Sequence, residues 1–286
     1  MNRRDFLKAS SLAALGACSF TDIFADTAKQ KAVSDIVTLG PGVKISRLAM
    51  GTGTQGMGGS SNQTRQLGIK GLPDMLQAAF DSGVFFWDSA DQYGSHPYLK
   101  EGFKRVGRDK ITVLTKTHAT TAAEMKSDLD RFRRELGTDY IDILLLHCMT
   151  DPNWPQIKSG AMDVLSEARE AGIIKMHGTS CHTMGALKAA AASDWVQIDL
   201  ARINPAGAVM DAGPNDVIPV LRDMKSKGKA VIGMKIFGAG RLTDKIDDCL
   251  RFALGLDCID AMTIGFENYG QFAEVSKKFP ALSART

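Results

Sequence analysis

Four side chains that could move a proton together occur in this 286-residue chain, namely Asp88, Tyr93, Lys116 and His147. A lysine enclosed by protein needs an anionic partner, because an unpaired buried charge is very costly, and Asp88 could be that partner. A nearby cation favours the phenolate, so we expect Lys116 to lower the pKa of Tyr93. With His147 placed to hydrogen-bond a substrate oxygen, the four would form a proton relay to a carbonyl oxygen, with Tyr93 as the general acid.

The elements that carry these residues are predicted from alternating strand-like and helix-like segments. Most of the strand-like segments are near-continuous apolar runs, as expected for strands that are buried on both faces. Strands are predicted at 45–50, 84–88, 111–115, 140–146, 173–179, 195–200, 230–236 and 259–264. Helices are predicted at 71–82, 97–106, 123–136, 160–171, 184–192, 216–227, 245–254 and 270–278.

This alternation favours an α/β fold, and eight repeats favour a (β/α)8 TIM barrel, a parallel eight-stranded barrel, over a doubly wound sheet. A hairpin of residues 36–39 and 43–45, with a turn at 40–42, is expected to cap the bottom of the barrel. We assign residues 34–286 to this single domain.

The active site of a (β/α)8 barrel lies at the carboxyl ends of its strands. Asp88 ends the second predicted strand, Lys116 and His147 follow the third and fourth, and Tyr93 lies in the loop after the second. Each position also has a plainer interpretation, since Asp88 and Lys116 could form only a structural ion pair and His147 could be a core histidine. Their joint occurrence in strand order favours the catalytic interpretation.

The sequence around these positions resembles the aldo/keto reductase family. Residues 86–94, FWDSADQYG, are similar to the D-T/S-A-x-x-Y-G signature of that family, and 115–117 to the segment of its strand-3 lysine. Residues 139–147, DYIDILLLH, resemble its strand-4 segment, while 178–180 and 196–197 resemble its GxSN turn and strand-6 glutamine. The match runs from about residue 36 to the C-terminus, and the order and spacing of several separate motifs make it specific.

The resemblance implies an NAD(P)-dependent oxidoreductase that reduces an aldehyde or ketone to an alcohol, or catalyses the reverse, by hydride transfer. Tyr93 would donate the proton and Lys116 would tune it. Asp88 would hold Lys116, and His147 would orient the carbonyl group.

The cofactor contacts of the family carry over to four groups of residues. Ser180 and Gln197 would hold the nicotinamide amide, and Gly51, Thr52 and Gly53 would line the floor of its pocket. The loop after the seventh strand would lie near the diphosphate, where glycines let backbone amides approach, and the loop after the eighth near the adenosine ribose. These loops contribute Phe237, Gly238, Ala239, Gly240, Arg241 and Leu242, and Gly265, Glu267, Asn268 and Gln271, respectively.

Several positions depart from the family pattern. Cys181 replaces the asparagine of the Ser-Asn turn, Arg202 stands where many relatives carry an aromatic residue, and Lys235 lies in a segment that replaces a Tyr-x-Pro-Leu-like sequence. Glu267 occupies the loop where NADP-preferring relatives place Arg or Lys. A carboxylate would repel a 2′-phosphate, so we expect NAD to be used at least as well as NADP.

Substrate contacts are expected from Trp154, in the loop after the fourth strand, and from His118 and His182, just past strand ends. The short tail after residue 278 suggests an open cleft for a small aldehyde or a polar carbonyl such as a sugar. One alternative is a cofactor-binding sensor or partner barrel with little turnover. Another is a metal-dependent hydrolase with His118, His147 and His182 as ligands, which the lack of an HxH on the first strand disfavours.

Charge and cysteine content exclude other classes of function. The net charge of +3 is too small to argue for nucleic acid or an anionic membrane surface. None of the five cysteines forms a CxxC pair, so no metal site is predicted from them. The cysteines after Cys18 are expected to pack as small hydrophobes.

Residues 1–33 are predicted to be a twin-arginine export signal and a tether, because Arg3 and Arg4 precede Phe-Leu-Lys and an apolar stretch at 9–17. That stretch is too short to span a bilayer. An amphipathic N-terminal helix is the alternative. Residues 15–18, LGAC, also resemble a lipobox in which Cys18 would carry a lipid anchor, although an ordinary cleavage site nearby remains equally open. We therefore expect recognition by the twin-arginine export machinery, and a periplasmic or lipid-anchored protein.

Overall fold

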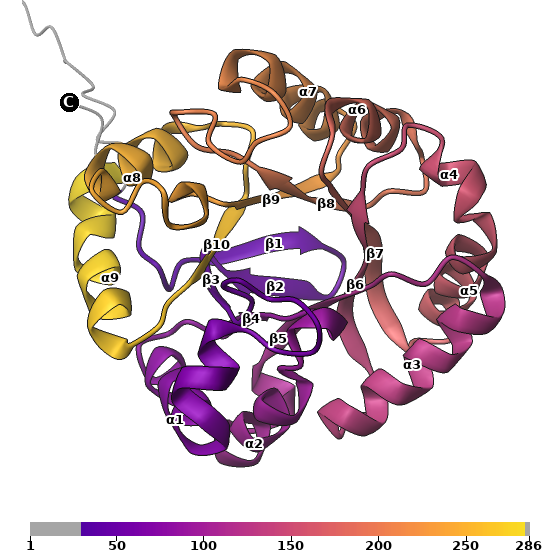
Figure 1. Cartoon of the computed structure of the whole chain (residues 1–286), viewed down its shortest axis with the longest axis horizontal. Coiled ribbons are helices and arrows are strands. Elements are labelled where there is room, and N and C mark those ends of the chain that lie inside the picture. The colour runs from indigo at the N-terminus through magenta and orange to yellow at the C-terminus, as the bar shows by residue number, and fades with distance from the viewer. Residues whose placement is uncertain (1–29, 284–286) are drawn as a thin grey trace, which may run out of the picture.

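The computed structural model describes residues 30–283, so the signal predicted at Arg3, Arg4 and Cys18 lies outside the described residues. Eight parallel strands close into a barrel that helices surround (Figure 1). The (β/α)8 barrel predicted from the sequence is thus confirmed.

The strands of the barrel follow one another in chain order, and the last is hydrogen-bonded to the first. They are β3 (Leu48–Gly51), β4 (Phe86–Asp88), β5 (Thr112–Thr117), β6 (Ile141–Met149), β7 (Ile174–Cys181), β8 (Ile198–Arg202), β9 (Ala230–Met234) and β10 (Ala261–Gly265). The α-helices are α1 (Asn62–Asp81), α2 (His96–Val106), α3 (Ala122–Leu136), α4 (Trp154–Ile157), α5 (Ser159–Glu170), α6 (Met184–Ala192), α7 (Pro214–Ser226), α8 (Ile246–Gly255) and α9 (Tyr269–Ser283). Short 3-10 helices are η1 (Asp91–Tyr93), η2 (Arg108–Lys110) and η3 (Gly238–Gly240).

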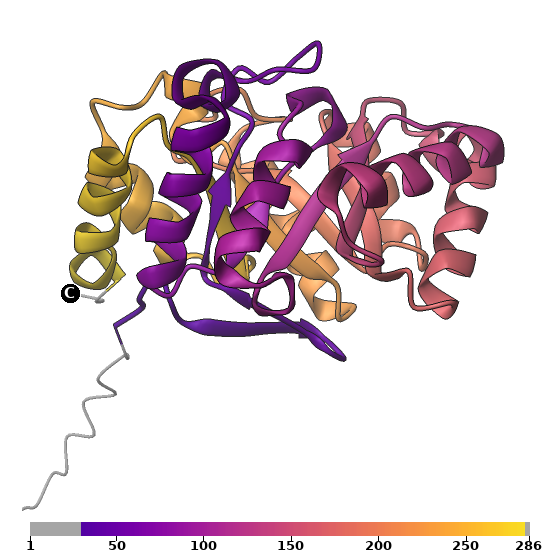
Figure 2. The same cartoon turned by 90° about the horizontal axis from the view of Figure 1, so that it is seen from below.

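An antiparallel hairpin of β1 (Ile36–Gly40) and β2 (Val43–Ser46) closes one end of the barrel, as predicted (Figure 2). Val43 and Ile45 are buried in the apolar cluster inside the barrel. The hydroxyl of Thr112, the first residue of β5, donates to the carbonyl of Lys44 at 2.6 Å. The hairpin therefore covers the amino-terminal ends of the strands and leaves the carboxyl ends for a functional site.

The side chains of each barrel strand contribute alternately to two apolar layers, one inside the barrel and one outside it, because successive side chains of a strand point to opposite faces. Phe86, Leu114 and Leu145 belong to the cluster inside the barrel. The residues between such positions pack against the surrounding helices. The next inward positions along β4, β5 and β6, at the open end of the barrel, are Asp88, Lys116 and His147.

Several elements differ from the sequence predictions, and three of the differences bear on the site. Helix α1 begins at Asn62 rather than at residue 71, because Ser61 and Thr64 form a capping box ahead of a kink at Gly68. The short helix α4 was not predicted. Strand β8 begins at Ile198 rather than at residue 195, which changes the position of Gln197.

Within residues 30–283 no helix is both long and apolar enough to cross a bilayer. Cys148, Cys181, Cys249 and Cys258 are free thiols. All of them except Cys148 are buried, in agreement with their predicted packing as small hydrophobes.

Candidate active site

Asp88 and Lys116 form a buried ion pair at the mouth of the barrel. The Lys116 ammonium donates to Asp88 Oδ1 at 2.5 Å and to the Ser89 carbonyl at 2.7 Å. Thr263 of β10 donates its hydroxyl to Asp88 Oδ2 at 2.9 Å. Burial acts to lower the pKa of Lys116, but its contacts with Asp88 and Tyr93 hold that pKa above its usual value. Lys116 therefore remains protonated and places a positive charge next to Tyr93.

Tyr93 is the last residue of η1, and its ring stands between two glycines. A Cβ added to Gly53 or to Gly56 would overlap this ring. Lys116 Nζ lies 4.9 Å from the ring centre. The backbone after β3 therefore fits around Tyr93 and fixes the ring beside the buried ion pair.

A chain of buried hydroxyl groups supports the same loop. Thr52 Oγ1 donates to the Asp88 carbonyl at 2.9 Å and lies 2.7 Å from Ser95 Oγ. Ser95 Oγ in turn lies 2.7 Å from Ser89 Oγ. These hydrogen bonds join the end of β3 to the segment between β4 and α2, which is the segment that carries Tyr93.

The fit of Tyr93 against Gly53 predicts a large effect of one added methyl group. In Gly53→Ala the ring must move away from its present place, and a misplacement of about 1 Å can cost about 100-fold in turnover. We expect kcat for carbonyl reduction to fall by about 10- to 100-fold, measured by reduced-nucleotide oxidation. Gly255→Ala is the matched control, because nothing lies within 4 Å of a Cβ at that position. Equal kcat in both variants would contradict this account of how Tyr93 is placed.

The pKa of Tyr93 differs from the sequence prediction. Burial raises this pKa above 10.0, and the opposing charge of Lys116 does not outweigh burial. The expected lowering is therefore wrong, because the prediction considered the neighbouring cation without the loss of solvent. Tyr93 is a protonated phenol at neutral pH, which is the form that a proton donor needs.

His147 lies beside Tyr93 and is neutral. The two ring centres are 5.8 Å apart and nearly perpendicular, and His118 stacks on His147 at 4.7 Å. Burial, followed by the charge of Lys116, lowers the pKa of His147 to about 2. Its Nδ1 is buried and has no hydrogen-bond partner among the described residues. A neutral imidazole with such an atom is suited to bonding a group that comes from outside the chain.

Only one of the two residues expected to grip the nicotinamide amide lies at the mouth. Ser180 Oγ accepts from the Cys148 amide at 3.0 Å, which leaves its own hydrogen available to donate. Gln197 precedes β8 and accepts from the His177 amide at 3.1 Å, about 16 Å below the end of that strand at the usual rise per residue. The expected role of Gln197 is therefore wrong for this structure. Cys181 is buried in the layer between barrel and helices.

Gly51 and Gly265 face each other where β3 and β10 pair. A Cβ on Gly51 would come within 3.0 Å of Gly265 N, so the missing side chain allows these two strand ends to pair. The absence of a side chain at Gly53 likewise leaves room for the Tyr93 ring. The three positions predicted as a pocket floor, with Thr52 between them, thus have packing roles of their own.

The loop after β10 lies beside the start of α1. Glu267 Oε1 accepts from Asn62 Nδ2 at 2.5 Å, and the Glu267 amide donates to Gln271 Oε1 at 2.9 Å. Asn268 Oδ1 accepts from the Gln271 amide at 3.0 Å. The predicted group of Glu267, Asn268 and Gln271 is therefore one connected cluster, and it carries a single carboxylate.

The loop from Phe237 to Leu242 is closed by its own hydrogen bonds. The amides of Gly238, Gly240, Arg241 and Leu242 donate to carbonyls within residues 235–238. Ala239, whose φ is 56°, is exposed. The predicted phosphate-binding loop is present at the mouth, but these bonded amides would have to be released before they could meet a phosphate.

Two of the three predicted substrate residues lie at the mouth. His118 is exposed and bonded to Gln92 Oε1 at 3.0 Å, and His182 Nδ1 lies 3.0 Å from Cys148 Sγ. Trp154 does not face the mouth as a substrate wall would. It is 2% exposed, and its Nε1 donates to the Ala186 carbonyl at 3.2 Å. The prediction for Trp154 is wrong because α4 turns this side chain into the layer between the barrel and α6.

Three further residues of the mouth received no role from the sequence. Arg202 ends β8, where it bonds Asp211 Oδ1 and donates to the His182 carbonyl at 2.7 Å. Cys148 and Lys235 both have left-handed backbones, with φ of 62° and 57°. All three residues lie near the carboxyl end of a strand, and this position is the feature of the sequence that could have identified them as residues of the mouth.

Among the described residues, no group of three or more His, Cys, Asp or Glu side chains is arranged to hold a metal ion. The mouth offers instead a phenol, a buried ammonium–carboxylate pair, a neutral imidazole and a free hydroxyl hydrogen. This donor set fits a carbonyl group and the amide of a nicotinamide. The mouth of this (β/α)8 barrel therefore has the groups that a carbonyl oxidoreductase would need.

The comparisons with known proteins identify the family. The aldo/keto reductase family model matches residues 47–253, and the chain belongs to that family. Its members are NAD(P)-dependent oxidoreductases that act on carbonyl compounds.

Two curated relatives and one solved structure are similar to this chain. A D-galacturonate reductase of Hypocrea jecorina is 33% identical over 99 residues, 30% of this chain and 32% of the relative. An aldo-keto reductase of Strobilurus tenacellus is 29% identical over 178 residues, 59% and 51% of the two chains. The match thus spans about a third and about half of these curated relatives. A structure assigned to the aldo-keto reductases of Pseudomonas aeruginosa has a TM-score of 0.72 and 19% identity, covering 88% of this chain and 98% of that one, which shows the shared fold.

Proposed function

We propose that the protein is an NAD(P)-dependent carbonyl reductase, or the corresponding alcohol dehydrogenase, in which Tyr93 is the proton donor. The observation that carries the proposal is the Lys116 ammonium, which is paired with Asp88 and lies 4.9 Å from the centre of the Tyr93 ring. A positive charge at that place stabilises the phenolate that forms when the proton leaves.

Each residue of the mouth would have its own role in such a reaction. When bound, the nicotinamide supplies a hydride to the carbonyl carbon. Tyr93 donates its phenolic proton to the carbonyl oxygen, and the neutral His147 fixes that oxygen by a hydrogen bond. Ser180 donates to the nicotinamide amide. In the reverse direction, the Tyr93 phenolate accepts the proton of the alcohol.

A polar substrate is supported by the curated relative that reduces D-galacturonate, a sugar acid. The purified protein should oxidise NADH or NADPH when D-galacturonate, other uronic acids, aldoses or small aldehydes are added. If the nucleotides bind and none of these carbonyl compounds is reduced, the proposal is wrong and a cofactor-binding sensor is favoured. On the basis of the sequence alone, the proposal includes export by the twin-arginine machinery to a periplasmic or a lipid-anchored location.

We expect NADH to bind at least as tightly as NADPH. Glu267 is the carboxylate of the loop after β10, and neither Asn268 nor Gln271 is a cation that could meet a 2′-phosphate. The neighbouring Arg65 already donates to Asn62 and Ser60. Quenching of tryptophan fluorescence on titration with each nucleotide measures both dissociation constants. Glu267→Gln should strengthen the binding of NADPH and leave that of NADH nearly unchanged. A strong wild-type preference for NADPH would refute this expectation.

A further inference from the structure

Lys235 differs from the other cations at the mouth because its ammonium makes no hydrogen bond or ion pair with any residue that the structure describes. Lys116 is paired with Asp88, and Arg202 with Asp211. Lys158 donates to the carbonyls of His118 and Ala119 and to the hydroxyl of Thr120. The nearby carboxylates are thus already engaged.

The backbone of Lys235 is held by hydrogen bonds in the left-handed conformation, which residues other than glycine rarely adopt. Its φ is 57°, directly after β9 ends. Its carbonyl accepts from the Gly238 amide at 2.8 Å and from Asn204 Nδ2 at 3.1 Å. Asn204 is fully buried and holds its own loop through Ala206 and Ala208. Strained residues of this kind gather at binding sites, where the surrounding structure fixes them.

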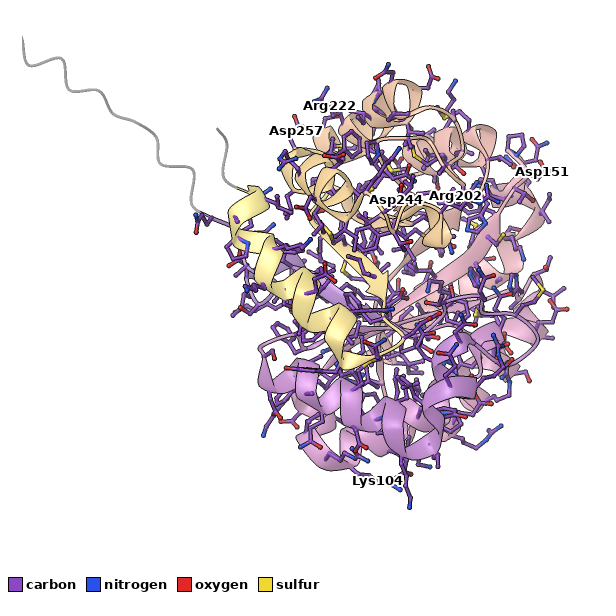
Figure 3. All side chains as sticks on the ribbon, turned by 60° about the vertical axis from the view of Figure 1, so that its left-hand side comes forward. Lys104, Asp151, Arg202, Arg222, Asp244 and Asp257 are labelled. Atoms are coloured by element: carbon purple, nitrogen blue, oxygen red, sulfur yellow. The ribbon has the colours of Figure 1, made fainter. Side chains whose placement is uncertain are left out.

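Strand order places Lys235 across the mouth from the proton donor. In the closed barrel, β9 is four strands away from β5 in either direction, so Lys235 lies opposite Lys116. Arg202 lies next to it at the end of β8. Figure 3 labels Arg202, whose side chain lies well inside the outline of the molecule, whereas Lys104 projects from it.

The charges around Lys235 show which part of the mouth it faces. Burial lowers the pKa of Lys235, and Lys116 and Arg202 lower it further, whereas Asp88 and Cys148 act to raise it. Lys235 in turn contributes to the lowered pKa of His147 and of His182. These mutual influences agree with the strand order, which places Lys235 at the same mouth as Lys116 and His147.

We propose that Lys235 binds a carboxylate of the substrate, so that the site prefers carbonyl compounds that carry an acidic group. This inference rests on the proposed function, and it adds the class of substrate. A compound with its carbonyl oxygen at Tyr93 and its carboxylate at Lys235 would span the mouth, and Arg202, held by Asp211, would add positive charge from the neighbouring strand. Binding of such an anion would supply the partner that Lys235 lacks within the described residues.

The experiment compares D-galacturonate with D-galactose, which differ only by a carboxylate in place of a hydroxymethyl group. Wild-type protein should reduce D-galacturonate with the higher kcat/KM. Lys235→Gln should lower kcat/KM for D-galacturonate by about 10- to 100-fold, the usual worth of a charge-assisted hydrogen bond. The value for D-galactose should change by less than about 3-fold, because that sugar has no charge for the lysine to meet.

Two variants and one binding measurement complete the design. Lys235→Arg keeps the charge and should retain the preference for the acid, and Lys126→Gln removes an exposed lysine of α3 as the matched control. Calorimetry of D-galacturonate binding to protein saturated with the oxidised nucleotide involves no turnover. It should show the same 10- to 100-fold loss, to within about a factor of two, in Lys235→Gln alone.

The outcomes are distinct. Equal losses for both sugars with weaker nucleotide binding would show that Lys235 meets the diphosphate, and this would overturn the proposal. Equal rates for the acid and the neutral sugar in the wild type would overturn it even if Lys235→Gln failed to fold. Loss of acid binding in Lys235→Gln without turnover in any variant would support the anion site and refute the proposed function instead.

Discussion

Tyr93→Phe should lower kcat for carbonyl reduction by about 100- to 10,000-fold, the usual contribution of a general acid. The variant removes one oxygen atom, and the ring can stay between Gly53 and Gly56. The proton donor is lost, while the groups expected to hold the nucleotide are unchanged. The dissociation constant of the nucleotide, measured by fluorescence quenching, should therefore remain within about 3-fold of wild type, because the transition state alone has lost an interaction.

Tyr98→Phe is the control for loss of a tyrosine hydroxyl elsewhere. Tyr98 belongs to α2, and its hydroxyl donates to the Thr64 carbonyl at 3.5 Å, away from the mouth. Its kcat should equal that of wild type. Full turnover in Tyr93→Phe would show that Tyr93 is not the proton donor.

Lys116→Met should both abolish turnover and destabilise the fold. Removing one partner of a buried ion pair leaves an uncompensated charge, which costs about 3–5 kcal/mol of unfolding free energy. In this variant Asp88 would keep only the Thr263 hydroxyl on its side chain. Urea unfolding followed by circular dichroism measures the loss. Lys126→Met, which changes an exposed lysine, should be within about 0.5 kcal/mol of wild type.

The double variant Asp88→Asn, Lys116→Met separates stability from chemistry. Asparagine carries no charge, so the main cost of the single variant is removed and much of the stability should return. Turnover should stay low, because the cation beside Tyr93 is still missing. Recovery of turnover together with stability would mean that the pair is only structural.

The barrel and the meeting of Asp88, Lys116 and His147 could be predicted because both follow from strand periodicity. An apolar run that ends in a polar residue marks the carboxyl end of a buried strand, and in a closed barrel all such ends meet. The ring of Tyr93 could be placed only roughly, since its position depends on Gly53 and Gly56 from a different loop. Its raised pKa depends on burial, which has no signature in the local sequence.

Other errors come from boundaries and from the direction in which a side chain points. Strand β8 begins three residues later than predicted, so Gln197 lies before the amino-terminal end of the strand and not near the mouth. The helix α4 turned Trp154 inward, where the sequence suggested an open loop. The sequence placed Arg202 and Lys235 near strand ends. Whether either could bind a substrate depends on which cations already have an anionic partner, and only the folded structure shows that.

The slot that Gly53 and Gly56 form around Tyr93 has a consequence for the thermodynamics of catalysis. A ring packed between two backbone segments loses conformational entropy during folding. The proton donor is thus preorganised before any substrate arrives, and none of the binding free energy of the substrate is consumed in ordering it. A small glycine-lined backbone segment, which itself contributes no functional group, therefore acts on the activation barrier by removing freedom of motion from the residue beside it.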